Sequence, residues 1–271
     1  MTTTYSSYQS TFTGTDGDDA VSFQNGAGIV DMGAGNDAVY ASGFVNELDM
    51  GEGNDFASFS GYAGANSIDL GEGTNTLFVE EGYVDQITGG SGTDNVTLGS
   101  GGARIVDLGE GDNQLFAEGY VQDVTTGSGV DNVSLDAGGT DVSLGGGDDI
   151  FRTDAYVDDM KAGSGDDTIS AENGGNFFGE EGDDQFNFDA EDANGAPTSF
   201  DGGTGVDTLT ISVESFDDLD FGQLSDDLSD YASTGEATLS QFNIDITDID
   251  VIEVEVNGST IETYDYGDLF A

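Results

Sequence analysis

Short runs of alternating apolar and polar residues follow one another along most of the chain, separated by glycine-rich turns. One such unit is Gly163–Ala171, in which a glycine-rich turn leads through Asp167 into a short alternating strand. Apolar side chains two and four residues after the aspartate, here Ile169 and Ala171, fall on one face of that strand. A further apolar position recurs seven residues before the aspartate, here Met160, and indicates a second strand. Each unit is therefore predicted to contain two short strands and two turns.

The unit repeats at nearly constant intervals. Its aspartate or asparagine occurs at Asp19, Asp37, Asp55, Asn75, Asp94, Asn113, Asp131, Asp149, Asp167, Asp184 and Asp207. Short repeats that cannot bury their own apolar face stack on one another as a solenoid. The pattern predicts an all-β fold, a parallel β-roll or β-solenoid of about eleven coils at residues 14–209, after an N-terminal lead-in at residues 1–13.

The remaining residues, 210–271, contain fewer glycines and longer β-type runs. They are predicted to form a small β-rich C-terminal cap over the last coil. Asn257-Gly258 between two alternating runs indicates a hairpin. The acidic stretch around residues 216–231 is expected to hold one short helix.

The net charge restricts the conditions under which the chain can fold and the partners that it can bind. With 3 basic and 56 acidic residues, the formal net charge is −53. A chain of this charge repels itself, so we expect it to fold only where cations neutralise it. Nucleic acid and anionic membranes are poor partners for the same reason, and no apolar run approaches the length of a membrane span.

The residue types that are missing also narrow the chemistry. The chain has no Cys and no His, which removes disulfides, thiolate sites, the usual zinc ligand and the commonest general base. We therefore expect a protein that is not an enzyme.

The glycine-rich turns are candidate calcium sites. Glycine allows backbone conformations closed to other residues and lets carbonyl oxygens approach an ion, while the following Asp adds a charged oxygen. Calcium takes six to eight such oxygens, which two stacked turns can supply and one cannot; magnesium fits less well. A single turn of this kind would be an ordinary surface turn, but the repetition in register favours a column of roughly ten calcium ions, each between adjacent turns.

The turn pattern resembles the nonapeptide of RTX, or hemolysin-type, calcium-binding β-rolls, Gly-Gly-x-Gly-x-Asp-x-apolar-x. Gly89–Thr97 and Gly202–Thr210 match it in full, whereas other units replace the first glycine, as Met50, Leu70 and Thr126 do. The resemblance implies a right-handed parallel β-roll, calcium between turns and folding only where calcium is plentiful. It also implies type I secretion through a C-terminal signal, which Tyr266–Ala271 resembles.

The chain departs from the RTX pattern in two ways. It carries the motif in only one of the two turns of each coil. Asn75 and Asn113 also replace the aspartate with an uncharged oxygen ligand, so calcium is expected to bind more weakly around those turns.

Aromatic residues recur on alternate coils: Tyr40, Phe44, Phe78, Tyr83, Phe116, Tyr120 and Tyr156. By strand alternation, Tyr40, Phe78 and Phe116 point outward at intervals of about 10 Å. Such a ladder is a candidate contact surface for another protomer or a glycan. Alternatively, these rings only stack on one another or lie beneath a loop.

Two functions fit these features. The first is a secreted calcium-binding structural protein that folds on calcium binding and assembles, through coil ends or the aromatic ladder, into a surface layer, filament or matrix. The second is a calcium-dependent adhesin or glycan-binding module at the cell surface. A flat Thr/Asx ladder for ice binding is not evident, because the residue between the two turn glycines varies among Ala34, Glu52 and Ser91.

Overall fold

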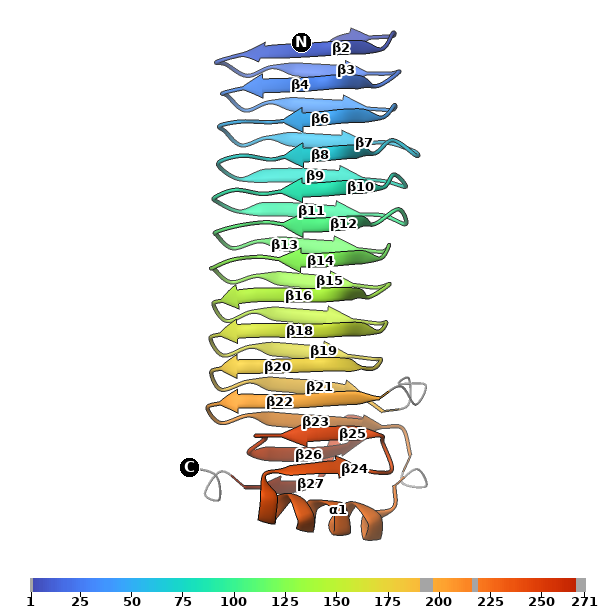
Figure 1. Cartoon of the computed structure of the whole chain (residues 1–271), viewed down its shortest axis with the longest axis vertical. Helices are drawn as coiled ribbons and strands as arrows, with labels where there is room; N and C mark the ends of the chain where they lie inside the picture. The colour runs from blue at the N-terminus through green and yellow to red at the C-terminus, as the bar shows by residue number, and fades with distance from the viewer. Residues whose placement is uncertain (1, 191–196, 216–218, 267–271) are drawn as a thin grey trace. The chain divides into compact units, whose positions relative to one another are not determined.

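The computed structural model describes residues 2–190, 197–215 and 219–266. Within these ranges nearly every element is a strand, and the chain divides into two compact units, residues 1–139 and 140–271. Up to residue 213, consecutive strands of each unit alternate between two parallel sheets (Figure 1). The expectation of an all-β parallel solenoid is therefore confirmed. No helix among the described residues is both long and apolar enough to cross a membrane.

Unit 1 contains two sheets. Sheet A consists of β1 (Thr3–Tyr5), β3 (Ala20–Phe23), β5 (Ala38–Ala41), β7 (Phe56–Phe59), β9 (Asn75–Val79), β11 (Asp94–Leu98), β13 (Gln114–Ala117) and β15 (Asn132–Leu135). Sheet B consists of β2 (Gln9–Thr15), β4 (Ala27–Gly33), β6 (Val45–Asp49), β8 (Ala65–Asp69), β10 (Val84–Thr88), β12 (Ala103–Asp107) and β14 (Val121–Thr125). The segment expected as a lead-in thus supplies β1 and most of β2, which pair in parallel with β3 and β4.

Unit 2 continues the same alternation and ends differently. Sheet A′ consists of β17 (Ile150–Thr153), β19 (Thr168–Ala171), β21 (Gln185–Asp189), β23 (Thr208–Val213), β26 (Val251–Val256) and β27 (Ser259–Asp265). Sheet B′ consists of β16 (Gly139–Gly146), β18 (Val157–Ser164), β20 (Gly175–Glu181), β22 (Thr198–Thr204), β25 (Ile244–Thr247) and β24 (Glu236–Leu239). The only helix in the described ranges, α1 (Phe221–Thr234), lies between β23 and β24.

The repeat register buries one column of side chains on each strand. Val21, Val39 and Ala57 lie opposite one another on β3, β5 and β7, and each is at most 1% exposed. On the facing sheet, Val30 and Leu48 are at most 2% exposed. Each buried Val or Leu contributes about 1.5–3 kcal/mol. The core is thin but continues through every coil of a unit.

The C-terminal segment extends the coil pattern before it caps it. β25 and β26 pair in parallel with β22 and β23, so coil geometry continues past residue 210. β24 and β27 then pair antiparallel with them and end both sheets. The hairpin expected at Asn257-Gly258 is present, with positive φ at both residues.

Helix α1 starts at the cap residue Asp220 and ends at Gly235, whose φ is 77°. It fixes the cap through Tyr231, whose hydroxyl donates to Ile249 O and accepts from Ile249 N, both at 2.6 Å. Phe216 and most of the expected secretion signal, residues 267–271, lie outside the described residues. Tyr266, the first residue of that signal, is buried against the Tyr231 ring.

Candidate metal centre

Glycine holds the specialised turns in a backbone conformation that other residues avoid. Gly51 and Gly53 have φ of 87° and 144°, and a Cβ on either would lie 1.8 Å from the carbonyl oxygen of Gly33 or Gly35 in the preceding coil. The paired glycines recur through both units with positive φ. They allow the carbonyl oxygens of successive turns to approach one another closely.

The predicted aspartates form a ladder along these turns. The backbone N–H of Asp19 donates to Asp37 Oδ1, and that of Asp37 donates to Asp55 Oδ1, both at 2.7 Å. The same bond joins Asp55 to Asn75, Asp94 to Asn113 and Asn113 to Asp131 in unit 1, and Asp149 to Asp167, Asp167 to Asp184 and Asp184 to Asp207 in unit 2. One side-chain oxygen of each acceptor, a carboxylate oxygen of Asp or the amide oxygen of Asn, thus holds the turn of the preceding coil.

The second carboxylate oxygen is buried without a donor. This holds for Oδ2 of Asp37, Asp55, Asp94, Asp167, Asp184 and Asp207, which find no hydrogen-bond partner among the described residues. These side chains are 0–3% exposed. An ionised oxygen in this position is costly unless a proton or a cation compensates it.

Burial changes the acidity of these groups accordingly. It raises the pKa of Asp55 and Asp94 to about 6, and those of Asp167 and Asp207 to about 7. The backbone hydrogen bond to each carboxylate opposes this shift but is too weak to cancel it. In the absence of a cation, burial therefore makes protonation of these carboxyl groups more favourable in the folded turns than in the unfolded chain.

Oxygen atoms from two successive coils converge where some turns lack a side chain. An ideal Cβ on Gly89 would lie 2.4 Å from Asp94 Oδ2 and 2.2 Å from Leu108 O. One on Gly202 would lie 2.6 Å from Asp207 Oδ2 and 2.1 Å from Asp248 O. A carboxylate oxygen and a carbonyl oxygen thus lie beside the same bare glycine Cα, and such a pair of hard oxygen donors suits calcium.

The turn of Asn113 shows what satisfies these oxygens internally. Its Nδ2 donates to Gly109 O at 3.2 Å, Gly111 O at 2.9 Å and Thr126 O at 3.3 Å. The amide thus places a donor among three backbone carbonyls from two coils, whereas an aspartate offers them no proton when ionised. Asn75 uses its amide differently, donating to Asp94 Oδ1 at 3.0 Å.

The residues fit calcium only through a mixed set of ligands. Within the described ranges, no three acidic side chains gather around one point. Any ion would therefore take one or two carboxylates and complete its shell with turn carbonyls, as the sequence argument expects. Asp19 is the least buried of the predicted ligands, and its Oδ2 already accepts from Thr15 N at 2.7 Å.

Two features of the site were missed from the sequence. Asp250 extends the ladder of unit 2, because its Oδ2 accepts from the backbone N–H of Asp207 at 3.0 Å. No glycine-rich turn precedes Asp250. The only sequence signal for it is the alternating run Val251–Val256 that follows.

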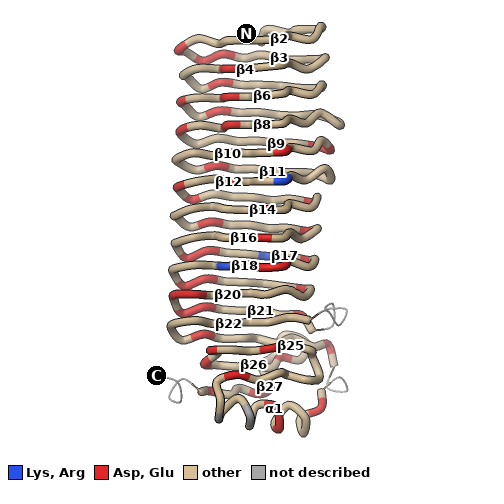
Figure 2. Tube along the Cα trace, in the orientation of Figure 1, with Lys and Arg blue, Asp and Glu red and all other residues tan. Residues whose placement is uncertain are grey.

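The second missed feature is an exposed ladder one residue before the first. Asp18 Oδ1 accepts from Asn36 N at 2.8 Å, and Asn36 Oδ1 accepts from Asn54 N at 3.0 Å. Asp148, Asp166 and Asp183 make the same contact in unit 2. Here the side chain accepts from the following coil rather than the preceding one, so the two ladders bind each turn from both sides. Acidic residues accordingly recur at this edge of the coils (Figure 2).

The predicted aromatic surface separates into two sets. Tyr40, Phe78 and Phe116 point outward from sheet A with 41–43% of their surface exposed. Phe44, Tyr83, Tyr120 and Tyr156 are also exposed, but each immediately precedes a strand, β6, β10, β14 or β18, at the unspecialised turn. The Tyr40 ring lies 5.6 Å from that of Phe56.

Fold and turns together define a parallel β-solenoid with a ladder of buried acidic side chains at one edge of its coils. Comparison of the chain with models of known families, with curated proteins and with solved structures finds no match.

Proposed function

We propose that this chain is a calcium-stabilised structural protein of the cell exterior. The observation that carries the proposal is the row of buried Asp Oδ2 atoms without donors. Six carboxylates in this state are tolerable only if they are protonated or bound to cations. At the pH and millimolar calcium outside a cell, a site of carboxylate and carbonyl oxygens binds calcium.

The residues that would hold the ions are the buried aspartates and the carbonyls of the adjoining turns. Asp94 with Leu108 O, and Asp207 with Asp248 O, are the best-defined pairs. Bound calcium would supply positive charge to these oxygens and reduce the self-repulsion of the chain. Folding would then follow calcium concentration, and a chain exported unfolded would fold only outside the cell.

A structural role agrees with the large share of the chain that forms repeating coils. Repeating coils and their cap make up nearly all of the described residues, and each coil serves mainly to bind its neighbours. In this proposal the protein leaves the cell by type I secretion and self-assembles into a surface layer, filament or matrix once calcium has lowered its charge.

Two measurements test the proposal separately. Isothermal titration with calcium should show several sites and a simultaneous gain of β-structure by circular dichroism. Light scattering and electron microscopy in millimolar calcium should show assemblies that dissociate in chelator. Absence of calcium binding would contradict the metal site, whereas a fully folded, calcium-loaded monomer at high protein concentration would contradict assembly.

A further inference from the structure

The outer face of sheet A in unit 1 carries no charge. Its outward side chains on β3 to β15, here named the uncharged face, are Ala20, Ser22, Ala38, Tyr40, Phe56, Ser58, Thr76, Phe78, Asn95, Thr97, Gln114, Phe116, Asn132 and Ser134. In a chain with a net charge of −53, this neutrality sets the face apart from its surroundings.

The outer face of sheet B in the same unit shows the contrast. Asp31, Asp49 and Asp69 lie in register there and are exposed. Partial loss of solvent around the carboxyl group, together with repulsion from Asp69 and Asp31, raises the pKa of Asp49. Solubility alone would be served by acids on both faces, so it does not account for the uncharged one.

Aromatic and hydroxyl side chains alternate on the uncharged face. Phe78, Thr97, Phe116 and Ser134 lie opposite one another on β9, β11, β13 and β15. Ser58 precedes Phe78 in the same column. Rings therefore recur on every second coil, about 10 Å apart.

Amide side chains form a second column beside the rings. Asn95, Gln114 and Asn132 are register partners on β11, β13 and β15. Their side-chain amides make no hydrogen bond with any residue in the described ranges. Together with Thr97, Phe116 and Ser134 they line a shallow hollow of about 200 Å³ around the Phe116 ring.

We infer that the uncharged face binds an uncharged, extended β-1,4-linked polysaccharide running across the strands. Aromatic rings stack on the apolar faces of pyranose rings, and free amides and hydroxyls bond to their hydroxyl groups. In such a chain each sugar advances by about one coil spacing, and every second sugar presents the same ring face. The rings at Phe78 and Phe116 match that two-sugar period.

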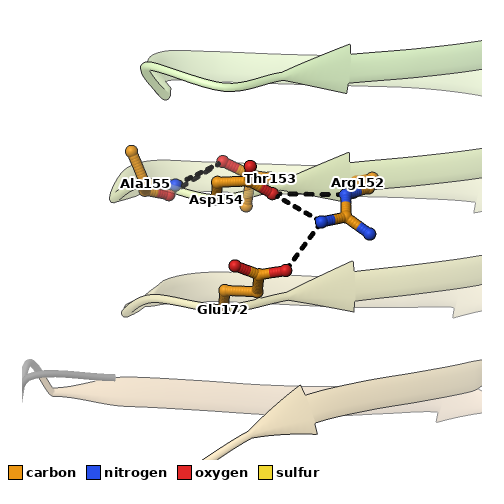
Figure 3. Close-up of polar contacts among 5 residues, drawn as sticks. All are labelled: Arg152, Thr153, Asp154, Ala155 and Glu172. Carbon is orange, nitrogen blue, oxygen red and sulfur yellow. Dashed lines mark hydrogen bonds and ion pairs between the residues drawn. The ribbon is translucent and has the colours of Figure 1, made fainter. Parts of the chain in front are cut away.

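Charge favours this ligand over an anionic one. An acidic polysaccharide would meet the negative potential of the whole chain, whereas a neutral one would not. The corresponding face of unit 2 is less suitable, because Arg152 has the place on β17 that Phe116 has on β13. It pairs with Asp154 at 2.9 Å and with Glu172 at 2.6 Å (Figure 3). The inference goes beyond the structural role, since it requires calcium only for folding.

Binding of the calcium-loaded protein to cellohexaose, chitohexaose, insoluble cellulose and insoluble chitin tests the inference. Wild-type protein should bind at least one of these probes and should not bind polygalacturonate. Phe78→Ser/Phe116→Ser, which copies the chain's own Ser58 and Ser134, should weaken binding at least tenfold. Tyr62→Ser is the matched control, because Tyr62 is 88% exposed in the turn after β7 and should bind as wild type.

Circular dichroism in calcium checks that each variant folds. Gln114→Ala, which removes only an exposed amide, provides a second test if the aromatic variant unfolds, and it should also weaken binding several-fold. Failure of wild type to bind any β-1,4 probe would overturn the inference. So would a double variant that loses self-association in light scattering but keeps its affinity for the sugar, since the face would then serve contact between copies.

Discussion

The turn that carries Asn113 and the turns that carry buried aspartates have the same kind of backbone but satisfy their polar atoms differently. The Asn113 amide donates to three carbonyl oxygens from within the chain. At Asp94 or Asp207, the corresponding side chain adds another acceptor and no donor. The Asn113 turn is therefore complete by itself, whereas an aspartate turn needs a proton or a cation.

This difference is distributed unevenly between the two units. Both asparagine turns, Asn75 and Asn113, fall in unit 1, and every predicted ligand in unit 2 is an aspartate. Dependence on calcium should consequently be stronger in unit 2. The largest effect that we expect, unfolding on removal of calcium, follows from this contrast.

Removal of calcium should unfold the protein, beginning in unit 2. A chelator should abolish the β-sheet signal in circular dichroism and expand the chain toward a radius of gyration of about 60 Å, that of an unfolded chain of this length. Hydrogen exchange should lose protection in residues 140–271 at a higher calcium concentration than in residues 1–139. Magnesium should restore the fold poorly. Retention of the folded state in chelator would contradict the proposed role of calcium.

Converting aspartate turns into asparagine turns should make unit 2 resemble the Asn113 turn. Asp167→Asn/Asp184→Asn/Asp207→Asn should reduce the calcium stoichiometry by about three ions and leave more residual structure in chelator, because amides supply the missing donors. Calorimetric titration measures the first effect and circular dichroism the second. The control Asp148→Asn/Asp166→Asn/Asp183→Asn alters the exposed ladder and should leave the stoichiometry unchanged.

The reverse substitution, Asn113→Asp, should make a complete turn incomplete. It should destabilise the calcium-free protein by about 1–3 kcal/mol, because the hydrogen bonds of the amide are lost and a buried acceptor gains no donor. In calcium it should add about one ion. Denaturant unfolding and titration measure the two effects, with Asp112→Asn as a neighbouring control. Unchanged calcium binding would indicate that these turns do not hold ions.

Protonation at low pH should stabilise the aspartate turns as calcium does, but more weakly. The folded-state pKa values of about 6 for Asp55 and Asp94 and about 7 for Asp167 and Asp207 lie above the unfolded value near 3.9. The folded state then binds more protons, so this contribution to stability is full below about pH 4 and is lost as the pH rises through 6 to 7.

Calcium-free protein should therefore have a higher melting temperature at pH 5 than at pH 8. Calcium affinity should show the opposite trend and rise with pH over the same range, because protons compete for the same oxygens. The asparagine triple variant should show a smaller change in both measurements. Equal pH dependence in the variant and wild type would assign the effect to net charge instead.

The smallest expected effect concerns a turn in which a residue other than glycine has a positive φ. Glu180 has φ of 76° at a position where other turns place glycine. Glu180→Gly should stabilise the protein by about 1 kcal/mol, which raises the melting temperature by about 2–4 °C. Glu181→Gly, at the next residue, should destabilise it instead. A loss of stability in Glu180→Gly would show that the ion pair with Lys161 at 3.8 Å outweighs the strain.

The sequence alone determined the coil and its specialised turn. Side-chain alternation placed Val21 and Val39 in the core and Tyr40, Phe78 and Phe116 outside it, because strand geometry has a fixed period of two. The eleven turn residues also emerged from spacing alone, since each repeat is built in the same way.

Only the tertiary structure decided how those turn residues are used. Asp94 Oδ1 accepts a hydrogen bond from Asn75 Nδ2 of the neighbouring coil, nineteen residues away in sequence, whereas Oδ2 remains buried without a donor. Asp250 joined the ladder because β26 pairs with β23 across the inserted helix α1. The uncharged face likewise required register between strands, because a sequence specifies which side chains point outward, while pairing decides which of them become neighbours.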